Sequence, residues 1–195
     1  MPSKSIELEV AVTKGSSVTE LLENQIAEFD GIGLLFVDIG REAFAIPIHS
    51  VKEVIELTKI TSVPMCSSIV NGVINVRGSV VPVIDAATRI GMEQTQDYDK
   101  YSCIVLYERE DVTTNELIVL GLLVNRVRSI EMISDDMKTN KPAFGSHIPD
   151  LFVSQMIRLK EQVFPILDMP ALLDCEAINQ EILSNQHSSF RLREQ

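Results

Sequence analysis

The chain has 195 residues, of which 45% are hydrophobic, and a formal net charge of −11 at pH 7. This length and composition predict one ordinary domain or two small ones and exclude wholesale disorder. The negative charge argues against binding to a nucleic-acid backbone or an anionic membrane surface, and no apolar run approaches the roughly 20 residues of a membrane span.

Residues 1–31 are expected to form an N-terminal extension with one helix. The start lacks the apolar stretch of a secretory signal, and the chain has three widely spaced cysteines, so we expect a reduced, cytoplasmic protein. Residues 17–20 (SVTE) match a capping box, and apolar residues follow at helical spacing. Either the body of the protein or a partner must cover that apolar stripe; docking on the body is favoured, because an exposed stripe promotes association.

From Ile32 the hydrophobic period becomes strand-like. Residues 32–39 and 43–48 flank Gly40-Arg41-Glu42, which predicts a hairpin. Residues 50–57 continue as a turn or short strand. The stretch 71–91, NGVINVRGSVVPVIDAATRIG, then predicts a second hairpin followed by a short helix.

In this second hairpin the first strand alternates, with Ile74 and Val76 on one face and Asn75 and Arg77 on the other. A turn follows at Gly78-Ser79, and residues 80–84 form a second, apolar strand. Residues 86–90 then form a short helix that Asp85 caps.

The same plan returns 83 positions later, in residues 154–173 (SQMIRLKEQVFPILDMPALL). Four identities carry the alignment: Ile74 with Ile157, Val80 with Val163, Pro82 with Pro165, and Asp85 with Asp168. Residues 44–51 match residues 120–127 in the same way, at a separation of 76. We therefore predict an internal duplication.

A polar segment, residues 92–100, separates the two copies, and residues 101–107 and 116–124 read as strands. Many short strands with hairpin spacing predict a mainly β fold of two small barrels in tandem. Barrel one is expected at about 32–91 and barrel two at about 101–173, with a C-terminal tail, 174–195, that begins as a helix.

Residues 71–78 (NGVINVRG), followed by VVPVID, resemble the signature of CheW-like chemotaxis coupling proteins, and residues 50–55 and 163–168 resemble flanking segments of that family. The resemblance covers residues 32–173. It implies two five-stranded SH3-like barrels without catalytic activity or cofactor. It also implies an adaptor that joins the cytoplasmic tips of methyl-accepting chemoreceptors to the regulatory domain of the histidine kinase CheA.

The resemblance places a partner-binding surface on seven residues: Val51, Glu53, Val54, Gly72, Asn75, Arg77 and Val80. In the family the arginine matching Arg77 pairs with the glutamate matching Glu53. The alternative is a solvated arginine whose ion pair contributes only ~0.2–1 kcal/mol. Apolar strand residues are more often core than interface, and Gly72 suits a close backbone approach as well as a contact.

Two other functions stay open at this stage. One is a paralogue that serves another chemosensory or motility system, and the other is a small-ligand-binding or enzymatic barrel. The second is disfavoured because the histidines and cysteines show no metal-ligand spacing. Asp85 and Asp168 occupy equivalent positions in the two copies, which favours helix capping over a catalytic carboxylate pair.

Overall fold

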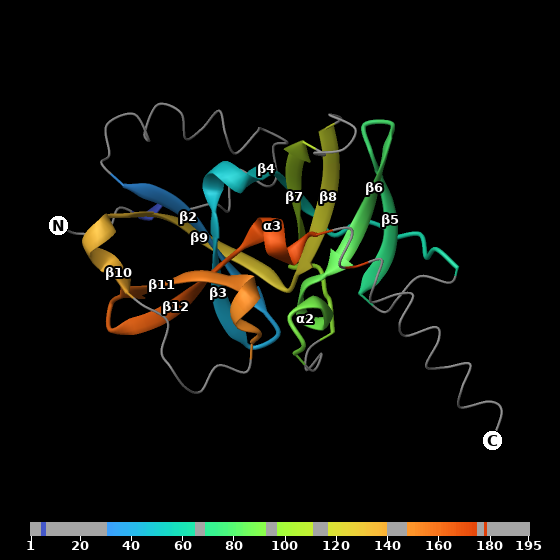
Figure 1. The fold of residues 1–195 in the computed structure, drawn as a ribbon. Helices are drawn as coiled ribbons and strands as arrows, with labels where there is room; N and C mark the ends of the chain where they lie inside the picture. Colours follow the sequence, from blue (N-terminus) through green and yellow to red (C-terminus); the bar gives the residue numbers. More distant parts are fainter. Residues whose placement is uncertain are drawn as a thin grey trace, which may run out of the picture.

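The computed structural model describes residues 5–6, 31–64, 69–92, 97–110, 117–139, 148–174 and 178. Over these residues the chain is mainly β, with two sheets and a few short helices (Figure 1). The helix expected within residues 1–31 and almost all of the tail, 174–195, lie outside the described residues. In the described part no helix is both long enough and apolar enough to cross a membrane.

Each repeat supplies five principal strands and a short helix, as the duplication predicts. The first repeat contains β2 (Ile32–Ile39), β3 (Glu42–Pro47), η2 (Ile48–Ser50), β4 (Val51–Glu56), β5 (Val70–Val76), β6 (Ser79–Asp85) and α2 (Ala86–Arg89). The second contains β7 (Cys103–Glu110), β8 (Leu117–Val124), β9 (Arg126–Ile133), η3 (Asp135–Met137), β10 (Lys138–Thr139), η4 (Asp150–Phe152), β11 (Val153–Leu159), β12 (Gln162–Leu167) and α3 (Met169–Leu172). A short strand, β1 (Ser5–Ile6), precedes both.

The two repeats exchange strands. The seven-stranded sheet has the order β1-β9-β2-β3-β12-β11-β10, and the five-stranded sheet has the order β4-β7-β8-β6-β5. Each sheet therefore combines the first hairpin of one repeat with later strands of the other. The parallel pairs β3–β12 and β6–β8 join them at equivalent places.

The expected bounds left open how strands are shared between the two barrels, and the sheet order answers that question. The bounds 32–91 and 101–173 delimit the two repeats, but neither sheet is built from one repeat alone. The chain leaves the first sheet through η2, between β3 and β4, and crosses back between β8 and β9. Figure 1 shows the seven-stranded sheet on the left and the five-stranded sheet on the right.

The exchanged hairpins are buried on both faces. In β2, Leu34 and Phe36 join a cluster within the seven-stranded sheet, whereas Leu35 and Val37 join a larger cluster that combines residues of both sheets. A third cluster fills the five-stranded sheet. Double-sided burial explains why these strands are apolar runs without strict alternation.

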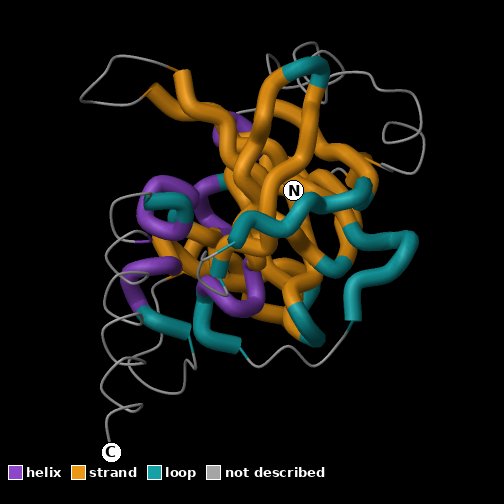
Figure 2. The backbone as a smooth tube through the Cα atoms, turned by 90° about the vertical axis from the view of Figure 1, so that its right-hand side faces the viewer, coloured by secondary structure: helices purple, strands orange, loops and turns teal. Residues whose placement is uncertain are grey.

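The short helices α2 and α3 are capped as predicted. Asp85 Oδ1 accepts a hydrogen bond from the Thr88 amide at 2.8 Å, and Asp168 Oδ1 accepts one from the Ala171 amide at 3.0 Å. Most of the helical turns lie on one side of the strands (Figure 2). The buried Arg89 of α2 joins the two repeats there, because its Nε donates to the carbonyl of Leu172 in α3 at 2.8 Å.

Candidate partner-binding site

The tip of the β5–β6 hairpin differs from the sequence expectation. The turn consists of Arg77 and Gly78, with φ angles of 51° and 92°, whereas Ser79 already belongs to β6. Two positive φ angles are what a two-residue turn needs to match the twist of its strands. Asn75 Oδ1 accepts from the Gly78 amide at 2.9 Å and so holds the turn. Arg77 thus stands in the turn and not on the outer face of the strand.

The ion pair implied by the family resemblance is present. Arg77 Nη2 donates to Glu53 Oε1 at 2.9 Å. Glu53 lies in β4, and β4 and β5 are the two edge strands of their sheet, so the pair connects opposite edges. The Glu53 side chain is 12% exposed and the Arg77 side chain 73%, which leaves the guanidinium open to a partner.

Apolar side chains at the same end of the sheet are exposed. Val80 of β6 and Leu117 of β8 are each 69% exposed. The two strands run parallel with Val83 opposite Gly121, so both side chains lie near the start of neighbouring strands. Asn75, Arg77, Glu53, Val80 and Leu117 are called the hairpin surface below. Sequence reasoning missed Leu117, because it begins an apolar run whose other residues are partly or fully buried.

Val51 and Val54 of β4 are buried. Each is 6% exposed and belongs to the cluster between the two sheets. Their side chains therefore belong to the hydrophobic core, as apolar strand residues more often do, and not to an exposed interface. They offer a partner little accessible area in this conformation.

Gly72 is constrained by its backbone surroundings. Its φ is +148°, and a Cβ there would lie 2.4 Å from the carbonyl oxygen of Thr61. Thr61 and Val73 exchange two backbone hydrogen bonds, of 2.8 and 2.9 Å, at this point. Gly72 thus permits the segment after β4 to pair with β5 at the edge of the sheet.

The carboxylate that caps α2 has a second hydrogen-bond partner in Tyr98. Tyr98 donates its hydroxyl to Asp85 Oδ2 at 2.8 Å. Burial raises the pKa of Tyr98, and the charge of Asp85 and this hydrogen bond raise it further. Across the described ranges no group of three or more His, Cys, Asp or Glu residues could hold a metal ion.

The fold and this hairpin match a known family. The sequence model of the CheW-like domain matches residues 33–177. This chain belongs to the CheW-like family. The family consists of non-enzymatic scaffold or adaptor proteins of chemotaxis signalling.

Individual CheW proteins show the same relationship. A probable chemotaxis protein CheW of Rhizobium etli is 30% identical over 139 residues, which cover 71% of this chain and 85% of that protein. Chemotaxis protein CheW of Bacillus subtilis is 26% identical over 144 residues, 74% of this chain and 87% of that protein. The crystal structure of the scaffolding protein TtCheW of Thermoanaerobacter tengcongensis shares the fold, with a TM-score of 0.64 and 24% identity, over 73% of this chain and 87% of that one.

Proposed function

We propose that this protein is a cytoplasmic adaptor that couples the tips of chemoreceptors to the regulatory domain of the kinase CheA in membrane-associated receptor arrays. Membership of the CheW-like family supports this role. The observation that carries the proposal on the molecule itself is the hairpin surface, where two exposed apolar side chains flank a charged pair. Exposed apolar residues around a specific polar group are typical of protein–protein interfaces.

The Arg77–Glu53 pair has different consequences for stability and for binding. In the free protein the arginine is mostly exposed, so the pair contributes at most ~0.2–1 kcal/mol to stability. A partner that covers Arg77 removes water from the pair. Loss of one member of a covered charge pair then costs about 2–5 kcal/mol of binding free energy. Val51 and Val54 are proposed to contribute by supporting β4 from beneath.

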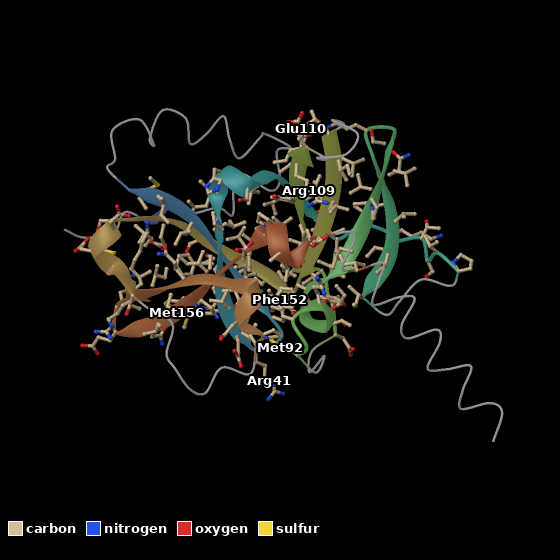
Figure 3. The ribbon with its side chains drawn as sticks, viewed as in Figure 1. Arg41, Met92, Arg109, Glu110, Phe152 and Met156 are labelled. Carbon is tan, nitrogen blue, oxygen red and sulfur yellow. The ribbon has the colours of Figure 1, made fainter. Side chains whose placement is uncertain are left out.

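The test compares two exposed turn arginines. Arg77→Ala should weaken binding to the CheA regulatory domain or to a receptor cytoplasmic fragment at least about tenfold, with little change in melting temperature. Arg41→Ala, in the β2–β3 turn, is the matched control. Figure 3 places Arg41 at the bottom of the molecule, whereas the β5–β6 tip is at the top. Calorimetric affinities for Arg77→Ala equal to those of the unmodified chain would refute the role of this surface.

A further inference from the structure

The strand β1 is the one described strand that the duplication does not explain. The order β4-β7-β8-β6-β5 of one sheet matches the order β9-β2-β3-β12-β11 within the other, strand for strand. The pairing of β10 with β11 has its counterpart in the isolated bridge between Thr61 and Val73. In the described part of the chain β1 has no such counterpart, and it precedes residues 33–177, which the family model matches. It is therefore an addition to the family's domain.

This added strand covers the outer edge of β9. Because β9 pairs with β2 as β4 pairs with β7, β9 is the counterpart of β4. In its own sheet β4 is an edge strand, whereas β9 has β1 on its outer side (Figure 1 shows β9 alongside β2). Ser5 lies opposite Glu131, and Ile6 lies opposite Ile130. Among the described residues, the rest of the outer edge of β9 pairs with no other strand.

The second repeat also lacks the ion pair that connects the two edges of the five-stranded sheet. Ser129 follows Glu53 by 76 positions, and Lys160 follows Arg77 by 83. A serine carries no charge, so the second repeat cannot form the same pair. Proteins commonly cover a strand edge, since its free backbone groups pair readily with another chain. At β9 the cover is a backbone strand.

The sequence of β9, RVRSIEMI, is complementary to itself when two copies run antiparallel. In a twofold arrangement Arg126 of one copy lies opposite Glu131 of the other. In the same register Val127 lies opposite Ile130, and both residues pack on the face toward the cluster between the two sheets. Opposite charges and apolar pairs that face each other across antiparallel strands stabilise the pairing. A twofold dimer uses the same patch on both copies, so each of these contacts occurs twice.

We propose that the outer edge of β9 is a self-association surface for a second copy of this chain, and that β1 of the same chain covers it. Because β1 is tethered, its effective concentration at β9 is of the order of a millimolar, far above that of a second copy in a micromolar solution. The full chain is therefore monomeric. Loss of β1 allows two copies to join their seven-stranded sheets through β9, at a place separate from the hairpin surface.

The test removes β1 in two independent ways. Sedimentation velocity at micromolar concentration should show a monomer for the full chain and a dimer for a variant that lacks residues 2–13. In the full chain, the double variant Ser5→Pro/Ile6→Pro removes both backbone amide hydrogens of β1 and should also produce the dimer. This second variant decides the question if the shortened chain fails to fold, as judged by circular dichroism.

A charge reversal on β9 locates the contact. Introduced into the dimeric variant, Arg126→Glu places like charges opposite each other twice, and should weaken the dimer at least about tenfold. Arg158→Glu is the matched control, because it makes the same charge change at an exposed position of β11 and should leave the dimer intact. A full chain that is already dimeric would overturn the proposal. So would folded variants without β1 that stay monomeric, or equal dissociation constants for Arg126→Glu and Arg158→Glu.

Discussion

Gly72→Ala separates a backbone role of this glycine from a role in direct contact with a partner. The substitution places a Cβ 2.4 Å from the Thr61 carbonyl oxygen and 2.7 Å from Ile60 Cγ2, closer than real side chains approach. Because the Thr61 atom belongs to the backbone, the pairing between Thr61 and Val73 must open to make room. The variant should therefore lose stability before any partner is present.

The magnitude has two parts. An alanine at φ +148° carries backbone strain of about 1–3 kcal/mol. Loss of the two Thr61–Val73 hydrogen bonds adds about 0.5–1.5 kcal/mol each. The total of about 2–6 kcal/mol is a large fraction of the roughly 5–15 kcal/mol that stabilises a typical domain. At about 2–4 °C per kcal/mol the melting temperature should fall by at least about 4 °C.

Gly78→Ala is the matched control, since Gly78 also has a positive φ, +92°, but no atom lies within 4 Å of its added Cβ. It should show the strain without the collision. Urea unfolding followed by far-ultraviolet circular dichroism gives both free energies, provided that the m-values agree. If Gly72→Ala costs no more than Gly78→Ala, the close approach to Thr61 does not matter and the reasoning fails.

Three further substitutions test other parts of the fold. Arg89→Met should lower the free energy of unfolding by about 1.5–3 kcal/mol, because it removes the charged hydrogen bond to Leu172; an unchanged urea midpoint would contradict this. Glu161→Gly should raise stability by up to about 1 kcal/mol, since Glu161 has a φ of 68° in the β11–β12 turn, and a lower melting temperature would disagree. Tyr98→Phe should make the free energy of unfolding less dependent on pH. The pKa of Tyr98 in the folded protein lies above its ordinary 10.0. The stabilisation from Tyr98 is therefore complete below about pH 10 and is lost as the pH rises through the folded pKa. Urea midpoints measured at about pH 9 and 11 should therefore decline less in Tyr98→Phe than in the unmodified chain.

The sequence determined the parts of this protein that depend on local pattern. The repeat at a spacing of 83 residues predicted two hairpins, each followed by a capped helix. This was possible because strand alternation and N-cap chemistry depend on only a few neighbouring residues. Asp85 and Asp168 could be identified as caps for the same reason. The Glu53–Arg77 pair was found through the family resemblance and not through spacing.

Only the tertiary structure decided how the two repeats combine. A strand with two apolar faces can pair with either repeat at similar local cost, so the exchange of β2–β3 and β7–β8 between the sheets depends on packing across the whole molecule. The same packing buries Val51 and Val54, while Val80 and Leu117 remain at the open end of a sheet. Valines of the same strand-forming type thus lie in the core or at the surface depending on contacts with residues distant in the sequence. The local sequence pattern carries no information about those contacts.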